Sequence, residues 1–231
     1  MYLAKLYNEP LDEIIMSEVM YDSQRNISGE NPEHMRFVRE VAIPLFENWG
    51  YKVTIVRGEI DYLTFFNRVI ERPRKHLENT GKCFGFPCGA RCGIRRDCKV
   101  RPIEKYLKSL DGEIVQYCGI CADETTRLCS MHKSGKVSLL EKYGVTQEET
   151  RELCLSQGLF SPSYEYSERG GCWMCPFAKQ AEHEAIRAMD PKLWEEFVSL
   201  EQREDIANKR WNVFSETLYE RNLRINVYAN Q

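Results

Sequence analysis

The chain contains ten cysteines among 231 residues, and two of them stand in one short glycine-led stretch. Residues 170–176 read Gly-Gly-Cys-Trp-Met-Cys-Pro, so two residues separate Cys172 from Cys175. At this spacing a tight turn can present both sulfurs to one ion, and thiolates suit zinc or an iron–sulfur cluster. In a reducing compartment, so many cysteines are more typical of metal or redox chemistry than of a disulfide framework. The sequence therefore predicts a metal site to which this pair contributes half of the ligands.

Several other cysteines could complete the ligand shell. They are Cys83, Cys88, Cys92 and Cys98 in one basic stretch, and the pair Cys118 and Cys121 with Cys129 nearby. Spacing alone favours Cys118 and Cys121. However, Cys118 lies within a predicted strand, where its side chain would point into packed residues, and free cysteine is commonly a small buried apolar residue. We therefore expect Cys118 and Cys154 to be core residues.

Positive charge is concentrated in one part of the chain. Residues 72–108 carry a net charge of +8, whereas the whole chain carries −3. Clustered cations raise the local concentration of anions, so this segment favours a phosphorylated or sulfated ligand or a nucleic-acid backbone. A solvated basic surface is the alternative interpretation.

The N-terminal half alternates between the two regular structures. We expect the end of a helix at residues 2–7, a strand at 12–20, a helix at 32–49 with a kink at Pro44, a strand at 51–57 and a helix at 61–70. Residues 71–101 form a glycine-, proline- and cysteine-rich loop, and loops of this length usually carry function. A helix at 102–110 and a strand at 113–120 follow. This order predicts an α/β fold with a parallel sheet.

The chain becomes helical beyond Gly144. Thr146 and Glu149 form a capping-box pattern, Gly158 is a helix stop, and Asp190 followed by Pro191 opens another helix. We expect two parts, an α/β domain over residues 1–145 that includes the basic loop and a helical subdomain over 146–231 that contains the CxxC turn. Trp173, Trp194 and Trp211 are predicted to be packing residues.

Three segments, taken together and in this order, resemble one family. They are CGIRRDCKVRPIEKYL, QYCGICADETTR and LCLSQGLFSPSYEYSERGGCWMCPFA. The chain is similar over residues 1 to about 180 to the phosphoadenosine phosphosulfate reductase family, within the adenine nucleotide alpha hydrolase-like superfamily, in its phage and mobile-element branch. This resemblance implies a Rossmann-like parallel sheet flanked by helices, with an adenine nucleotide, ATP or phosphoadenosine phosphosulfate, bound where its strands end.

The resemblance also implies residues of the site. One cysteine pair before the KVxPI segment and one in GGCWxCP would bind zinc or a [4Fe–4S] cluster, which here means Cys92, Cys98, Cys172 and Cys175. Four thiolates leave no open position for water, so the metal would be structural; unligated reduced thiols are the alternative. Asp22 lies at a strand end near the nucleotide in related proteins, with a turn or cap aspartate as the alternative. Asp123, Glu124 and Arg127 match ADExxR and would orient a nucleotide or metal, with a surface ion-pair cluster as the alternative. The remaining anion contacts would be Arg91, Arg95, Arg96, Lys99 and Arg169, since guanidinium groups match phosphate and sulfate geometry.

Two features of the family are missing from this sequence. The phosphate-binding loop of the type SGGKDS and its strand do not precede Met1, so we expect an upstream start or a fragment. The C-terminal ECGxH-type segment with the nucleophilic cysteine is also missing, and no cysteine follows Cys175. A covalent sulfur route would need a thiol of the basic loop, such as Cys83 or Cys88, with its pKa lowered by neighbouring cations.

The first functional hypothesis is an enzyme of the reductase or transferase type that uses an adenine nucleotide. The second is a catalytically silent, metal-stabilised module whose basic loop contacts nucleic acid. The third is an inactive fragment. No apolar run approaches the ~20 residues of a membrane helix, and the early acidic residues argue against a signal peptide. We therefore expect a cytoplasmic protein with no membrane partner, and the sequence does not indicate an oligomeric state.

Overall fold

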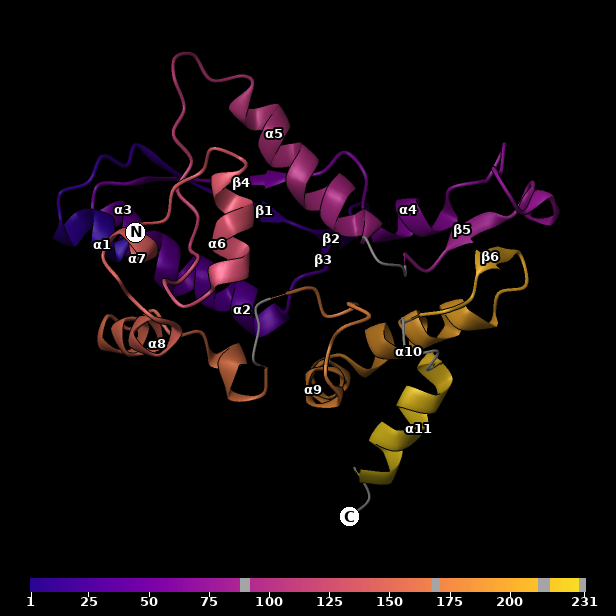
Figure 1. The fold of residues 1–231 in the computed structure, drawn as a ribbon. Coiled ribbons are helices and arrows are strands. Elements are labelled where there is room, and N and C mark those ends of the chain that lie inside the picture. Colours follow the sequence, from indigo (N-terminus) through magenta and orange to yellow (C-terminus); the bar gives the residue numbers. More distant parts are fainter. Residues whose placement is uncertain (88–91, 168–170, 212–216, 229–231) are drawn as a thin grey trace. The chain divides into compact units, whose positions relative to one another are not determined.

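The computed structural model describes residues 1–87, 92–167, 171–211 and 217–228. Over these residues the chain is a mixed α/β protein in which short strands form small sheets flanked by helices (Figure 1). The strands are β1 (Glu13–Glu18), β2 (Met20–Asp22), β3 (Ile27–Ser28), β4 (Lys52–Arg57), β5 (Cys83–Gly85) and β6 (Ile206–Asn208).

The helices are more numerous than the strands and dominate the C-terminal half. They are α1 (Tyr2–Leu6), α2 (Pro32–Phe37), α3 (Ile43–Asn48), α4 (Tyr62–Asn67), α5 (Arg101–Leu107), α6 (Thr125–His132), α7 (Leu139–Lys142), α8 (Gln147–Ser156), α9 (Gln180–Met189), α10 (Pro191–Ser199) and α11 (Leu218–Tyr228). Two π-helical turns, Val38–Ala42 and Arg95–Val100, and three 3-10 turns, Leu77–Asn79, Pro162–Glu165 and Leu200–Gln202, complete the described elements.

The chain forms two compact units, each assembled from three stretches. Unit 1 comprises Met1–Met16, Arg36–Thr54 and Tyr106–Pro162, and unit 2 comprises Ser17–Met35, Ile55–Lys105 and Ser163–Gln231. The sequence predicts a single boundary after residue 145. The observed division differs, because the last stretch of unit 1 runs to Pro162.

Each sheet of the described chain has two strands. β1 pairs with β4, β2 pairs with β3 in antiparallel register, and β5 pairs with β6 in parallel register. In the parallel pair Cys83 lies opposite Ile206 and Gly85 opposite Asn208. The predicted strands at 12–20 and 51–57 are therefore present, and the β5–β6 pair joins residues more than a hundred positions apart.

The strand predicted over residues 113–120 is wrong. Tyr117 makes only an isolated parallel bridge to Val137, supported by the Cys118 N–H to the Val137 carbonyl at 2.8 Å. Ile114 and Val115 are exposed. A strand needs a neighbouring strand along its length, and its β-branched residues stabilise it only where they can pack. Residues 113–120 have neither a neighbouring strand along their length nor packing partners that bury Ile114 and Val115.

The helix beginning at Pro32 changes its winding before Pro44, where the sequence predicts a kink. The π-helical turn Val38–Ala42 lies between α2 and α3, and the Ile43 N–H donates to the Val38 carbonyl. Proline has no N–H to donate and disturbs the preceding turn, which explains a wider turn there. The basic loop is also shorter than expected, because π-helical winding begins at Arg95 and continues into α5.

The predicted helix caps are confirmed. Thr146 and Glu149 form a reciprocal capping box at the start of α8, and Gly158 follows this helix with a φ of +66°. Asp190 caps α10 by accepting a hydrogen bond from the Leu193 N–H at 3.0 Å. These signals succeed because a cap depends on residues within one turn of the helix.

The larger hydrophobic core belongs to unit 2. It contains Trp173, Trp194 and Trp211, each at most 2% exposed, so their predicted packing role is confirmed. Trp173 lies within 5.2 Å of Phe197 and 4.9 Å of Tyr21 between ring centroids. Aromatic burial on this scale stabilises the unit that also carries the CxxC turn. A smaller cluster in unit 1 centres on Leu3, Ala4 and Leu139.

We expect Gly85→Ala to destabilise unit 2. Gly85 has a φ of +83°, and a Cβ there would lie 2.3 Å from the Asn208 carbonyl oxygen. The strained backbone and the clash together should lower the free energy of unfolding by about 2–4 kcal/mol in urea titrations. Gly81→Ala is the matched control, since Gly81 has the same φ of +83° with nothing within 4 Å, and it should cost only ~1 kcal/mol. Equal losses in the two variants would contradict the role given to the β5–β6 approach.

Candidate thiolate site

The CxxC turn is held against the segment that follows β3. Cys172 bridges Glu30 in antiparallel fashion, and the Trp173 N–H donates to the Gly29 carbonyl at 3.0 Å. The Trp173 indole N–H donates to the Ser28 carbonyl, also at 3.0 Å. A Cβ on Gly29 would lie 2.2 Å from the end of the Met174 side chain. A larger residue at position 29 would therefore require the buried Met174 side chain to move.

Within the turn, backbone hydrogen bonds fold the chain back on itself. The Cys175 N–H donates to the Cys172 carbonyl at 3.1 Å, and the Ala178 N–H donates to the Cys175 carbonyl at 3.0 Å. Both cysteines are partly buried. The predicted geometry, two sulfurs presented by one tight turn, is thus supported by the hydrogen bonds of the loop.

The basic segment contributes a third sulfur to the same unit. Cys92 stands just before the helical residues, and its Sγ accepts a hydrogen bond from the Arg95 N–H at 3.4 Å. Cys92 and Cys172 both pack against the core of unit 2. A backbone N–H directed at sulfur stabilises the thiolate form, which is the form that binds metals.

Charge on three sulfurs affects the pKa values of buried groups in unit 2, and we call Cys92, Cys172 and Cys175 the cysteine cluster. Burial raises the pKa of Cys172 well above its usual value, and charge on Cys175 and Cys92 raises it further. Burial also raises the pKa of Tyr62, with added contributions from all three sulfurs. These charge effects involve residues of two segments that lie far apart in the sequence.

Cys98 belongs to this unit but makes a contact of its own. It is completely buried, and its thiol donates to the Ile60 carbonyl at 3.3 Å. Burial raises its pKa to about 12, followed by smaller effects of Asp97, Asp61 and Cys92. Cys98 is thus coupled to the cluster through Cys92, while its hydrogen bond is that of a buried thiol.

An ion pair supports the cluster. Lys99 Nζ lies 2.8 Å from a Glu30 carboxylate oxygen, and the Glu30 side chain is only 3% exposed. Burial by itself would lower the pKa of Lys99, yet the Cys172 sulfur and Glu30 hold it above its ordinary value. Lys99, which was predicted to contact an anion, thus pairs with the buried Glu30 carboxylate, and the charge of Cys172 also acts on it. Its positive charge offsets the negative charge of thiolates.

Among the residues that the structure describes, no three His, Cys, Asp or Glu side chains are already arranged to hold a metal ion. The donor chemistry still fits a soft metal, because the cluster supplies thiolates, one N–H bonded sulfur and a neighbouring cation. Cys83 is separate from it, with its sulfur 3.4 Å from Arg203 Nη2 and 3.5 Å from Asp205 Oδ2. Cys88 lies outside the described residues.

The arginines of the basic segment have different roles. Arg96 contacts Asp97 with two nitrogen–oxygen distances of 2.7 and 2.6 Å, and Arg101 approaches the same carboxylate at 2.7 Å. Arg95 is exposed. Arg96 is therefore partly committed to an internal ion pair, whereas Arg95 presents its charge to solvent. Arg91 and Arg169 lie outside the described residues.

Asp22, at the end of β2, has the contacts of a turn residue. Its Oδ1 accepts from the N–H groups of Gln24 and Arg25 at 2.9 and 3.1 Å, and its Oδ2 lies 2.6 Å from the Arg25 Nε. Arg25 also binds Glu196, with a nitrogen–oxygen distance of 2.5 Å. These contacts are the ones expected for the alternative interpretation of Asp22, a turn aspartate.

Asp123, Glu124 and Arg127 form a local group in unit 1. Glu124 accepts from the Cys121 N–H at 3.0 Å and pairs with Arg127 within the first turn of α6. Asp123 accepts from the Gln147 N–H at 3.1 Å and so joins the start of α8. The observed contacts are those of a surface ion-pair and capping cluster, which the sequence left as an alternative.

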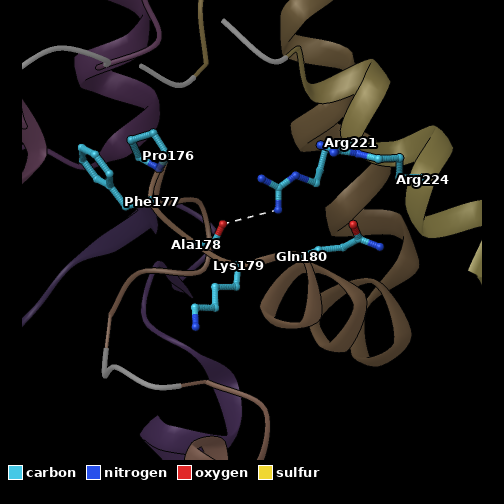
Figure 2. Close-up of a pocket in the computed structure, with 7 residues that line it drawn as sticks. All are labelled: Pro176, Phe177, Ala178, Lys179, Gln180, Arg221 and Arg224. Carbon is cyan, nitrogen blue, oxygen red and sulfur yellow. Dashed lines mark hydrogen bonds between the residues drawn. The ribbon is translucent and has the colours of Figure 1, made fainter. Parts of the chain in front are cut away.

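A pocket of about 420 Å³ lies beside the residues that follow the CxxC turn (Figure 2). In Figure 2 the Arg221 guanidinium points toward the Ala178 carbonyl, to which it donates at 3.4 Å. The residues lining the pocket are Pro176, Phe177, Ala178, Lys179, Gln180, Arg221 and Arg224. Its three cations suit an anion, and the sequence pattern did not indicate them because Arg221 and Arg224 lie more than forty residues away.

Sequence reasoning missed three buried polar residues of this region, Glu30, Tyr62 and Asp97. Asp97 is an acidic residue within the basic segment, and it pairs with Arg96 and Arg101. Asp61 before Tyr62 is a helix-capping signal that locates Tyr62 on α4, but nothing in the sequence indicates its neighbours. No described helix is both long and apolar enough to cross a bilayer.

Comparisons with known proteins gave no match. No family model, no curated protein and no solved structure matches the chain. The similarity to the phosphoadenosine phosphosulfate reductase family, drawn from three sequence segments, therefore stays a prediction.

We expect Asp97→Asn to lower stability in a pH-dependent way. The hydrogen-bonded Arg96 lowers the pKa of Asp97 below its ordinary 3.8, burial opposes this, and charge on Arg96 and Arg101 adds to the lowering. The ionised carboxylate thus stabilises the fold above about pH 4, and this contribution disappears as the pH falls through the lower native pKa.

Urea unfolding at several pH values measures this effect. The variant should lose about 1–2 kcal/mol at pH 7, and the difference from the unsubstituted protein should shrink toward pH 3. Asp111→Asn, at an exposed position, is the control. A loss that stays constant from pH 7 to pH 3 would show that the Asp97 charge is not responsible.

Proposed function

We propose that the chain is a phosphoadenosine phosphosulfate reductase-like protein that binds an adenine nucleotide and carries a structural zinc ion or [4Fe–4S] cluster. In this proposal a Rossmann-like domain with a cysteine-rich basic loop is followed by a helical subdomain, as the resemblance implies. The observation that supports the proposal is the packing of Cys92 and Cys172 against the same hydrophobic core, that of unit 2. Cys92 lies in the basic segment and Cys172 in the CxxC turn.

Cys92, Cys98, Cys172 and Cys175 are the proposed ligands. A four-thiolate metal site supplies a crosslink between two chain segments and leaves no coordination position for substrate. The segments linked here are the helical basic segment and the turn that packs on residues 28–30. Binding energy of such sites reaches roughly 10–16 kcal/mol in small zinc domains, which is comparable to the stability of a whole domain.

A metal ion would have to compensate the charge of the thiolates that bind it. Lys99 supplies only one positive charge, which Glu30 already shares. The Arg95 N–H to Cys92 hydrogen bond is of the kind that orients a ligand sulfur. Cys98 would exchange its hydrogen bond to Ile60 for a bond to the metal.

We expect the purified chain to contain about one zinc or about four iron atoms per molecule by elemental analysis. Visible absorbance distinguishes the two, because only the iron–sulfur cluster is coloured. Cys92→Ser, Cys172→Ser and Cys175→Ser should each lose most of the metal. Cys129→Ser removes an exposed cysteine of α6 and should keep it.

Two results would overturn this part of the proposal. The first is an unsubstituted protein that is purified without oxygen, contains neither metal, and unfolds at the same temperature with or without added Zn²⁺. The second is a Cys129→Ser variant that loses as much metal as Cys172→Ser. Cys98→Ser tests the fourth ligand separately, since retention of metal there would restrict the site to the other three sulfurs.

Nucleotide binding is the second part of the proposal. The exposed charge of Arg95 supports it. Saturable binding of ATP or phosphoadenosine phosphosulfate should be measurable by calorimetry and should fall at least about tenfold in Arg95→Ala. Arg74→Ala removes one exposed charge from the same basic segment and should change the affinity little. No binding, or equal losses in the two variants, would contradict a defined nucleotide site.

Nucleic-acid binding is the alternative function, and one observation favours it. Arg95, Arg96, Arg101 and Lys105 are all exposed residues of one continuous helical segment. Phosphate contacts of this kind depend steeply on salt and little on sequence. Binding of single- or double-stranded DNA or RNA that weakens strongly with salt, in a protein that does not bind ATP, would favour this function over the first.

A further inference from the structure

The pocket beside the CxxC turn brings together positive charges from two parts of unit 2. Its volume of about 420 Å³ lies in the range of small-molecule sites. Three of its seven described lining residues are cations, namely Lys179, Arg221 and Arg224, and none of the seven is acidic. Figure 2 shows Pro176 and Phe177 on one side of the pocket and the two arginines, which belong to α11, on the other. The pocket therefore favours a small, negatively charged ligand.

Arg221 is the cation of the pocket that solvent reaches least. The residue is only 9% exposed, and its guanidinium carbon lies 5.3 Å from the centroid of the buried Trp211 ring. Its Nη1 donates to the Ala178 carbonyl, a neutral acceptor, at 3.4 Å. Burial lowers the pKa of Arg221, and charge on Glu182 opposes this effect. A cation that has lost much of its water attracts an anion strongly, because little solvent weakens the interaction.

The start of α9 adds to the positive potential of the pocket. Gln180 is the first residue of this ten-residue helix and lines the pocket, and Lys179 stands at the N-cap position. N-cap residues usually accept a hydrogen bond from the first turn, but an ammonium group has no acceptor to offer. The positive end of the helix dipole therefore lies beside a cation, although it favours anionic groups.

Carboxylates near the pocket compensate part of this charge. Glu182, in the first turn of α9, is 5% exposed, and its Oε1 accepts from the Lys179 N–H at 2.9 Å. The Glu184 Oε1 accepts from the Gln180 side-chain amide at 2.7 Å. Neither carboxylate is among the described lining residues. The surface that a ligand meets is therefore positive.

We propose that this pocket binds the dianionic phosphate group of a small phosphate monoester, held by Arg221, Arg224 and the start of α9. Guanidinium groups present N–H donors in a planar fork that matches phosphate oxygens, and N–H groups at a helix start bind the same group. Three cations favour a doubly charged monoester over the singly charged diester phosphates of a nucleic-acid backbone. The rest of the ligand lies against Pro176 and Phe177. This site goes beyond the proposed function, since it requires neither the metal nor the nucleotide contact of Arg95.

Methyl phosphate alone is the probe for this site in the full chain. Calorimetry measures its affinity at constant ionic strength and about pH 8, where a phosphate monoester carries nearly two negative charges. Dimethyl phosphate has similar size but a single charge. We expect it to bind at least about tenfold more weakly than methyl phosphate, because it has one charge fewer to pair with the cations.

Substitutions of the lining residues locate the binding. Arg221→Lys keeps the positive charge and removes the planar fork, whereas Arg224→Gln and Lys179→Gln each remove an exposed charge. Each should weaken methyl phosphate binding about tenfold, as the loss of one charged hydrogen bond does. Lys192→Gln is the matched control for Lys179→Gln, because Lys192 is an exposed lysine of α10 outside the lining residues. It should leave the affinity unchanged. The exposed positions keep the test valid even if circular dichroism shows that Arg221→Lys is unfolded.

The outcomes either support the site or overturn it. Binding of methyl phosphate that weakens in the folded lining variants, but not in Lys192→Gln, supports the proposal. Binding of dimethyl phosphate or of a short DNA duplex as tight as that of methyl phosphate would overturn it in favour of a nucleic-acid backbone. No binding of methyl phosphate at millimolar concentration, or equal losses in Lys179→Gln and Lys192→Gln, would also overturn it. Metal content and ATP affinity are separate measurements, so the proposed function and this site can fail independently.

Discussion

The hydrogen bonds between the CxxC turn and residues 28–30 are the interaction on which unit 2 depends. Trp173 donates from both its backbone and its indole nitrogen to this segment, while its ring enters the core. The same short stretch supplies Glu30, whose buried carboxylate holds Lys99. A single contact region therefore sets the position of two sulfurs and of the ammonium group that faces them. Electrostatics and packing are coupled there, since neither can change without moving Trp173.

Short-range sequence signals predicted local structure well, and long-range pairing poorly. The capping box at Thr146 and the Asp190-Pro191 start succeed because the groups that decide them lie within four residues. The strand over 113–120 fails because a strand depends on a partner that the sequence does not reveal. The parallel pairing of β5 with β6 was not predicted at all, for the same reason: Cys83 and Ile206 meet only after the chain has folded.

The same difference between short-range and long-range signals applies to the candidate site. Cysteine spacing predicts thiolate ligands, and the resemblance named Cys92, Cys98, Cys172 and Cys175, of which Cys92 and Cys172 pack on the core of unit 2. Asp22, Asp123 and Glu124 could be named as acidic groups at element ends, but their contacts with Arg25, Gln147 and Arg127 are turn, cap and ion-pair contacts. The sequence could not indicate the roles of Tyr62 and Glu30, because burial and hydrogen-bond partners are properties of the tertiary structure.

The interleaving of the two units has a consequence for how the polypeptide acquires its structure during synthesis. The last stretch of unit 2 begins at Ser163, whereas its first stretch ends at Met35. Residues 17–35 must therefore wait on the ribosome until the C-terminal third has emerged before Trp173 and Phe197, two aromatic partners of Tyr21, exist. Such separation in sequence slows folding and prolongs the exposure of apolar side chains. Early assembly is then left to the other unit, whose last stretch ends at Pro162.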